Sequence, residues 1–75
     1  MAEQRMIDSG ELETRFTYHA PKPGQPERYT QLRDAAWDLA CLIVDLTPAS
    51  REQSLAITKI EEAVFWASSA IARRE

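Results

Sequence analysis

The chain has 75 residues, 44% hydrophobic and 28% charged, with nine lysines and arginines against twelve aspartates and glutamates. A chain this short buries only about 60% of the surface that its unfolded form exposes, so its core is marginal unless metals, disulfides or association supplement it. A single cysteine, Cys41, and a single histidine, His19, exclude an internal disulfide and a Cys/His metal cluster. The formal net charge of -3 disfavours a general binder of DNA or RNA, which carries a basic excess.

No run approaches the roughly 18 consecutive apolar residues of a transmembrane helix, and the first residues lack the apolar segment of a signal peptide. An unpaired thiol is typical of a reducing compartment. We therefore expect an intracellular, soluble protein that does not interact with membranes and needs no metal or cofactor.

The first part of the chain divides into an N-terminal segment, residues 1–17, and a loop, residues 18–26. In the segment, Asp8 or Ser9 would cap a short helix, but a strand-like alternation is also present at Leu12, Thr14, Phe16 and Tyr18. We predict the short helix. The loop contains three prolines and Gly24, which can continue neither a helix nor a sheet ladder.

Helical periodicity dominates the rest of the chain. Over residues 27–46 apolar side chains recur every three or four positions, at Tyr29, Leu32, Ala36, Leu39, Ile43 and Leu46. Over residues 50–73 the same spacing recurs at Ile57, Ile60, Val64, Ala67 and Ile71. These patterns predict an all-α, single-domain protein, residues 1–75, built as an antiparallel helical hairpin.

Two starts are compatible with the second long helix. Ser50 and Gln53 have capping-box spacing, in which the Ser side chain accepts from a backbone N–H and the Gln side chain reaches back. Thr47 followed by Pro48 at the first helical position is an equally good start.

Both long helices carry more apolar surface than one shared seam requires. The surplus positions are Trp37, Cys41 and Val44 on the first helix, and Ala56, Ala63, Phe65, Trp66 and Ala70 on the second. Each large aromatic side chain needs on the order of 150–250 Å² of cover, more than the N-terminal segment offers. We therefore predict a homo-oligomer in which the chains cover each other.

Catalysis is poorly supported by the residues present. There is no Ser or Cys nucleophile paired with the single histidine and no glycine-rich phosphate loop. Glu61 and Glu62 are adjacent on a helix, where their side chains diverge onto a solvated face. His19 is compatible with a general base, and equally with a loop residue that bonds the backbone. We predict that the protein is not an enzyme.

Charge is unevenly distributed along the chain. Residues 1–14 carry four acids and one base, residues 15–33 carry four bases and one acid, and residues 34–62 carry six acids and two bases. The basic block ends near a helix N-terminus, which favours anions, and it contains Tyr18, His19, Arg28 and Arg33, side chains that suit phosphates and bases.

In two alternative interpretations these basic side chains have structural roles and bind no ligand. Arg28 and Arg33 would pair with Glu27 and Asp34 while Tyr18 packs against the hairpin. At the C-terminal end, Arg73 and Arg74 would compensate the helix dipole, by about 0.3–1 kcal/mol. Alternatively, several copies of this arginine pair would meet on the axis of a symmetric oligomer and form an anion-binding ring.

Two motifs resemble a known family. A Tyr-His-x-Pro loop from Tyr18 is followed by Arg-Tyr-x-x-Leu-Arg up to Arg33, and the chain ends with Trp-Ala-x-x-Ala-Ile-Ala-Arg from Trp66 to Arg73. In combination, over residues 11–75, the sequence is similar to the small phage proteins that share the hairpin domain of anti-CBASS protein 2 and the Thoeris anti-defence proteins.

The resemblance implies a sponge that binds and holds cyclic dinucleotides such as cGAMP in the host bacterial cytoplasm, so that the CBASS effector is not activated. It also implies a hexamer of interlocked hairpin dimers, with separate pockets for cyclic trinucleotides in several members. By position, Tyr18 would stack on a base and Arg33 would contact phosphates, with His19 and Arg28 nearby, while Arg73 or Arg74 would serve trinucleotides. The alternatives are capture of cyclic ADP-ribose isomers and a small helical adaptor that binds a host protein.

Overall fold

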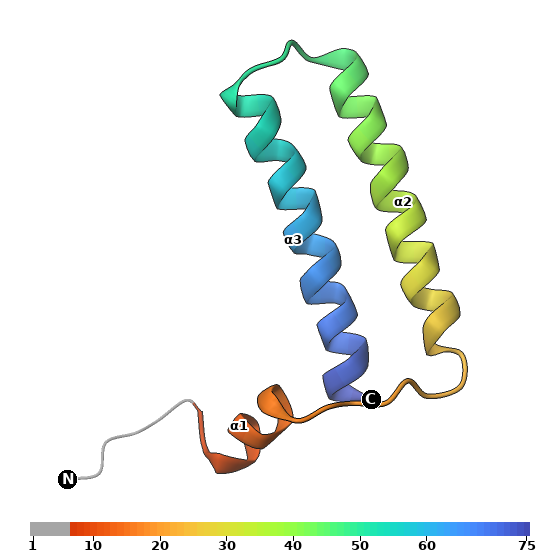
Figure 1. The fold of residues 1–75 in the computed structure, drawn as a ribbon, viewed down its shortest axis with the longest axis vertical. Helices are drawn as coiled ribbons and strands as arrows, with labels where there is room; N and C mark the ends of the chain where they lie inside the picture. Colours follow the sequence, from red (N-terminus) through yellow and green to blue (C-terminus); the bar gives the residue numbers. More distant parts are fainter. Residues whose placement is uncertain (1–6) are drawn as a thin grey trace, which may run out of the picture.

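The computed structural model describes residues 7–75, and these residues form three helices (Figure 1): α1 (Ser9–Phe16), α2 (Gln25–Leu46) and α3 (Arg51–Arg74). Helices α2 and α3 run antiparallel side by side, and α1 lies beside the C-terminal end of α3, on the side away from α2. The loop after α1 passes the end of α3 to reach the start of α2. The predicted all-α hairpin with a short N-terminal helix is confirmed. Residues 1–6 of the predicted N-terminal segment lie outside the described residues.

Helix α1 begins at a side-chain cap. The Asp8 carboxylate accepts a hydrogen bond of 2.8 Å from the backbone N–H of Glu11, and the backbone carbonyl of Asp8 accepts from the N–H of Leu12 at 3.0 Å. The first bond satisfies one of the N–H groups that have no partner inside the helix, and the second is the first backbone bond of the helical ladder. The alternation that suggested a strand therefore has no structural consequence, and that alternative is wrong.

Helix α2 begins two residues before the predicted position 27, so the loop between α1 and α2 is shorter than predicted. Gly24 precedes the helix with a φ of 84°, a left-handed conformation that glycine adopts without steric cost. Pro26 then lies in the first turn, where a missing N–H costs nothing. The Gln25 side chain accepts a 2.9 Å hydrogen bond from the N–H of Lys22 and holds the end of the loop against the helix.

The turn between α2 and α3 settles the choice between the two predicted starts. Ser50 caps α3, its hydroxyl accepting from the N–H of Gln53 at 3.1 Å, so the helix itself begins at Arg51. Thr47 instead ends α2, and its N–H donates to the carbonyl of Ile43. The Gln53 side chain does not reach back to Ser50. It donates to the carbonyl and the hydroxyl of Thr47, both at 3.0 Å, and ties the two helices together across the turn.

The hairpin seam is only half-buried. The predicted seam residues of α3 are all of intermediate exposure, whereas Leu39 and Leu46 of the α2 stripe remain exposed. Among residues 7–75, no hydrophobic residue is fully buried, and the one buried residue is Gln25 at 3% exposure. A single chain therefore has no closed hydrophobic core.

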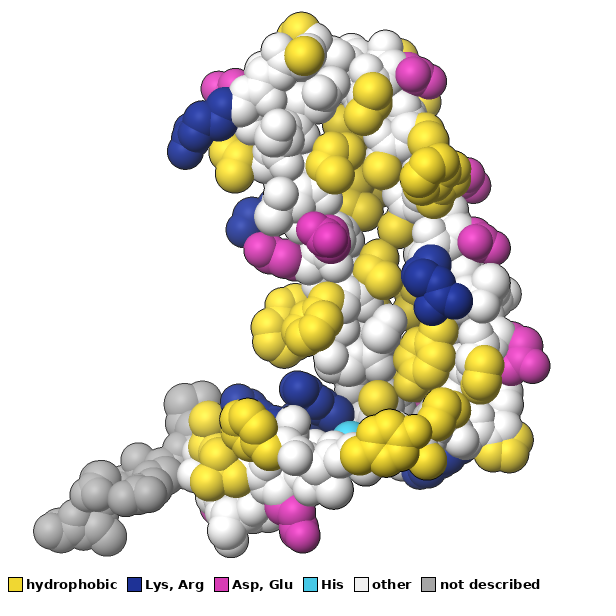
Figure 2. Space-filling view, in the orientation of Figure 1, with side chains coloured by type: hydrophobic (Ala, Val, Ile, Leu, Met, Phe, Trp, Pro, Cys, Tyr) yellow, Lys and Arg dark blue, Asp and Glu magenta, His cyan; other side chains and the backbone are white. Residues whose placement is uncertain are grey.

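The overall shape explains this lack of a core. The chain measures 52 × 38 × 13 Å, and its thickness is about that of one helix with its side chains, roughly 10–12 Å. The radius of gyration is 16.8 Å, whereas a compact chain of this length would have about 11 Å. Hydrophobic side chains are visible along the face between α2 and α3 and at both ends of the molecule (Figure 2). No described helix combines the length and apolar character that crossing a membrane requires.

The surplus apolar residues of the sequence analysis lie on the surface of the chain. Trp37 is 71% exposed, and Cys41, Val44, Phe65 and Trp66 are exposed as well. Trp37, Cys41 and Val44 line a shallow groove of about 280 Å³, together with Ile57 of α3. These faces are available for contact with other chains.

Candidate functional site

The six predicted site residues lie at one end of the molecule. Tyr18 and His19 are in the loop between α1 and α2, Arg28 and Arg33 are in the first three turns of α2, and Arg73 and Arg74 are in the last turn of α3. This end is where α2 begins, α3 ends and α1 lies next to α3 (Figure 1). Residues far apart in the sequence thus form one basic region.

A first groove lies between α2 and α3, and we call it the α2–α3 groove. It has a volume of about 350 Å³ and is lined by Tyr29, Arg33, Phe65, Ser68, Ser69 and Ala72. A guanidinium, two aromatic rings and two hydroxyl groups are thereby brought together. The Arg33 guanidinium donates to the Thr30 hydroxyl at 3.2 Å and forms no ion pair within residues 7–75, so its charge is available to an anion.

A second groove lies between α1 and α3, and we call it the α1–α3 groove. It has a volume of about 420 Å³ and is lined by Arg15, Phe16, Trp66, Ser69, Ala70, Arg73 and Arg74. Three arginines from two helices therefore surround it, next to two aromatic rings. The Phe65 and Trp66 rings, one in each groove, meet edge to face with centroids 5.0 Å apart.

Arg28 is engaged by a carboxylate from the other end of the chain. Its guanidinium binds Glu75 through two hydrogen bonds, of 2.8 and 2.5 Å, in the forked geometry typical of arginine. Gln25 also donates to the Glu75 carboxylate, at 3.2 Å, and the Lys22 ammonium donates to the Glu75 carbonyl. The hydrogen bond from Arg28 is the main cause that lowers the pKa of Glu75 to about 2, and the same bond raises the pKa of Arg28.

The predicted pairing of Arg28 with Glu27 is therefore wrong, and no ion pair joins Arg33 to Asp34 in the described chain. Spacing of one residue on a helix does not place side chains face to face, whereas the end of α3 packs beside the first turn of α2.

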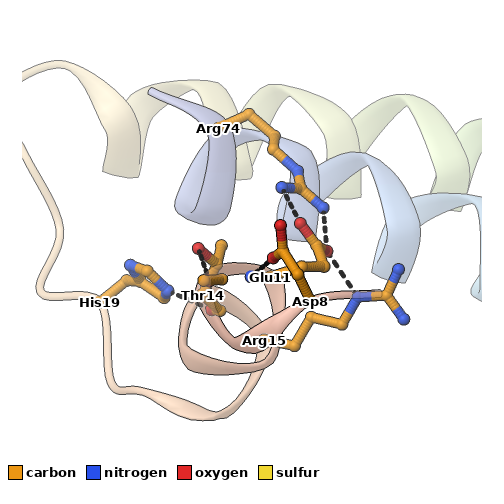
Figure 3. Close-up of polar contacts among 7 residues, drawn as sticks. Asp8, Glu11, Thr14, Arg15, His19 and Arg74 are labelled. Atoms are coloured by element: carbon orange, nitrogen blue, oxygen red, sulfur yellow. Dashed lines mark hydrogen bonds and ion pairs between the residues drawn. The ribbon is translucent and has the colours of Figure 1, made fainter. Parts of the chain in front are cut away.

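Arg74 and Arg15 share a second carboxylate (Figure 3). Arg74 donates two hydrogen bonds, of 2.8 and 2.7 Å, to the two carboxylate oxygens of Glu11, and Arg15 donates one of 2.6 Å from its Nε. The hydrogen bonds from Arg74 and then from Arg15 lower the pKa of Glu11 to about 2. The same hydrogen bonds with Glu11 raise the pKa of Arg74. Arg73 has no hydrogen-bond or ion-pair partner within residues 7–75.

The two loop residues differ in their surroundings. His19 forms a 2.7 Å hydrogen bond through Nε2 with the backbone carbonyl of Thr14, which ties the loop back to α1 (Figure 3). The carbonyl can only accept, so Nε2 carries the hydrogen. Of the two predicted roles, the loop residue that bonds the backbone is the one observed. Tyr18 is 81% exposed and lines neither groove, so the prediction that it packs against the hairpin is wrong.

Sequence reasoning missed part of both grooves. Sequence analysis assigned Phe65 to the apolar surplus and Trp66 to both that surplus and the C-terminal motif, and it gave Ser68 and Ser69 no role. The available signal was spacing along α3. Trp66, Ser69 and Arg73 are separated by three and four positions and share one face of the helix, and Phe65, Ser68 and Ala72 share the neighbouring face in the same way. Within residues 7–75, His, Cys, Asp and Glu side chains form no group of three or more that would hold a metal ion.

The fold and the site define a class of small helical-hairpin proteins with grooves lined by arginine and aromatic side chains at the open end of the hairpin. The model of the Acb2/Tad1 hairpin domain matches residues 8–72, and the chain belongs to this family. Membership implies an anti-defence nucleotide sponge of phages, which binds its ligand and is not an enzyme. No curated protein and no solved structure matches the chain.

Proposed function

We propose that this protein binds cyclic dinucleotides such as cGAMP in the host bacterial cytoplasm and holds them without degrading them. The observation that carries the proposal is the family match over residues 8–72. A sponge of this kind keeps the second messenger from the CBASS effector. It needs affinity without turnover, and the α2–α3 groove offers groups for affinity: one arginine, aromatic rings and hydroxyl groups.

In this proposal Arg33 contacts the ligand phosphates, because its guanidinium lies in the α2–α3 groove without a carboxylate partner in the described chain. Tyr18 stacks on a base. Since Tyr18 lines neither groove of its own chain and is strongly exposed, we propose that it reaches the ligand from a second copy. His19 and Arg28 would shape the site indirectly, the first by holding the loop and the second through Glu75.

The second copy belongs to a proposed hexamer of interlocked hairpins. The support is the thin, coreless single chain and its exposed apolar faces. Cyclic trinucleotides would bind a separate site near the ends of several α3 helices, where Arg73 and Arg74 lie. No interaction with DNA, RNA or membranes is part of this function.

The test is a melting-temperature screen of the purified protein with a panel of cyclic di- and trinucleotides and with a linear dinucleotide as control. A ligand at 100 times its Kd stabilises the folded protein by about 2.7 kcal/mol, which gives a clear rise in melting temperature. We expect a rise with at least one cyclic dinucleotide and none with the linear control. No rise with any cyclic nucleotide would overturn the proposal.

The panel also contains cyclic ADP-ribose isomers, because the matching family model covers Tad1 as well as Acb2. A response to these isomers alone would reassign the ligand from CBASS to Thoeris signals. A protein adaptor is the remaining alternative, favoured by the exposure of Trp37 and Trp66. It predicts a monomer or dimer in light scattering and no response to any nucleotide.

A further inference from the structure

Helix α1 holds its place on the hairpin with little help from apolar burial. Phe16 is 83% exposed, and Leu12 and Ile7, which lies just before the helix, are exposed as well. An isolated helix of eight residues is not stable in water, because nucleation costs more than so few hydrogen bonds return. Something other than hydrophobic packing must therefore keep α1 folded and in contact with α3.

The Glu11 carboxylate is the group placed to do this. Its side chain is only 21% exposed, although it is an acid on a short surface helix. The carboxylate lies between the guanidinium groups of Arg15, on its own helix, and Arg74, on α3 (Figure 3). Within residues 7–75, the hydrogen bonds that join α1 directly to α3 are the two from Arg74 to Glu11.

This contact also determines whether the α1–α3 groove exists. Arg15 and Phe16 form the wall of the groove on α1, and the other lining residues belong to α3. If α1 left the hairpin, the groove would lose this wall and one of its three arginines. A single surface ion pair contributes little to stability. A carboxylate that binds one arginine through two hydrogen bonds and a second arginine through a third has the geometry in which surface pairs do contribute.

We propose that Glu11 is a positioning residue that docks α1 on α3 through Arg74 and thereby builds the α1–α3 groove. Arg74 then has a structural task, and Arg73 is the arginine of the pair that is available to an anion in the groove. The role of Arg73 in binding an anion rests on the proposed function, whereas the docking role of Glu11 does not.

The experiment is hydrogen–deuterium exchange of the full chain without ligand, read at the amides of residues 12–16. We expect Glu11→Gln to speed their exchange about two- to fivefold, the range that a surface pair of this kind supports. Arg74→Gln should speed exchange as well, although it leaves the pair between Arg15 and Glu11 in place. The double variant Glu11→Gln/Arg74→Gln should be no faster than Glu11→Gln alone, since Glu11→Gln already removes the ion pair with Arg74. Glu13→Gln is the matched control, the same change on the same helix at a side chain without an ion pair in the described chain.

Arg73→Gln separates the two arginines and should leave exchange in α1 unchanged. Wild-type exchange rates in Glu11→Gln, or equal acceleration in Glu13→Gln, would overturn the docking role. Equal acceleration in Arg73→Gln and Arg74→Gln would overturn the division of tasks. Because no nucleotide is present, these results are independent of whether the sponge proposal holds.

Discussion

Single arginines at the open end of the hairpin have different tasks, and their partners distinguish them. Arg28 and Arg74 are engaged by Glu75 and Glu11, whereas Arg33 and Arg73 have no carboxylate partner in residues 7–75. Sequence analysis placed Arg28 and Arg33 in one basic block and Arg73 and Arg74 in a separate pair at the C-terminal end, and Glu27, its alternative partner for Arg28, is wrong. The true partners lie 47 and 63 positions away, a separation that local spacing does not reveal.

Arg33 provides the clearest test of the α2–α3 groove. If its guanidinium contacts ligand phosphates, Arg33→Ala removes charge-assisted hydrogen bonds and should weaken cyclic dinucleotide binding about 10- to 100-fold in calorimetry. Arg51→Ala is the control, because Arg51 begins α3 at the opposite end of the hairpin and lines neither groove. Equal affinity of Arg33→Ala and wild type would show that the groove is not the site.

Tyr18 tests whether the loop contributes to the same site. Stacking of a base on an aromatic ring is worth about 1–3 kcal/mol, so Tyr18→Ala should weaken binding by about 5- to 100-fold. Tyr18→Phe keeps the ring and should retain most of the affinity. Because Tyr18 is exposed in the single chain, neither change should alter the helical content measured by circular dichroism. Full affinity in Tyr18→Ala would remove the loop from the proposed site.

The Glu11 and Glu75 carboxylates make the stability of the folded chain depend on pH. The folded chain lowers the pKa of Glu11 and Glu75 from 4.5 to about 2 through hydrogen bonds from Arg74 and Arg28, respectively. A lowered pKa stabilises the folded chain above the unfolded value, and this contribution is lost as the pH falls from about 4.5 toward 2. The difference in melting temperature between wild type and Glu75→Gln should therefore be largest at pH 6 and should shrink steadily as the pH falls from about 4.5 toward 2. A constant difference over this range would contradict the assignment, and Glu61→Gln serves as control.

The helices themselves show what local chemistry determines. Periodicity identified both seams, and the caps at Asp8 and Ser50 follow from side chains that satisfy free N–H groups. The reversal of Gln53 toward Thr47 was not predictable in this way. This contact depends on the path of the turn between α2 and α3. The turn brings Thr47, at the C-terminal end of α2, within reach of Gln53 in the first turn of α3.

The cap of α3 can be tested by itself. Ser50→Ala removes the acceptor for the N–H of Gln53 and should lower the free energy of unfolding by about 1 kcal/mol. Ser54→Ala is the matched control, one turn further into the helix. Urea unfolding at fixed protein concentration measures both, since association would otherwise change the apparent stability. A loss in Ser54→Ala as large as that in Ser50→Ala would contradict the capping role.

The whole molecule is a single layer of helices, and this shape leads to the prediction of association. A layer about 13 Å thick leaves both faces of the hairpin open, so the aromatic side chains find no cover within the chain. The sequence analysis reached the surplus of apolar surface by counting helix faces. How the copies are arranged does not follow from that count, because side chains on two open faces allow more than one packing.

Light scattering tests this prediction. We expect wild-type protein to have the mass of about six chains, a number that comes from the family resemblance rather than from the single-chain structure. Trp37→Ser should shift the protein toward smaller species, because Trp37 lies on an exposed apolar face and contributes little to its own hairpin. A wild-type monomer would contradict the prediction and would leave the proposed site, with Tyr18 from a second copy, incomplete.

Sequestration without turnover is the central claim, and calorimetric titration with cGAMP followed by recovery of the nucleotide tests it most directly. After saturation the protein is denatured by heat, and the released nucleotide is measured by chromatography. We predict tight binding and quantitative recovery of intact cGAMP. Absence of binding to cGAMP, or recovery of a hydrolysed or linear product, would contradict the claim.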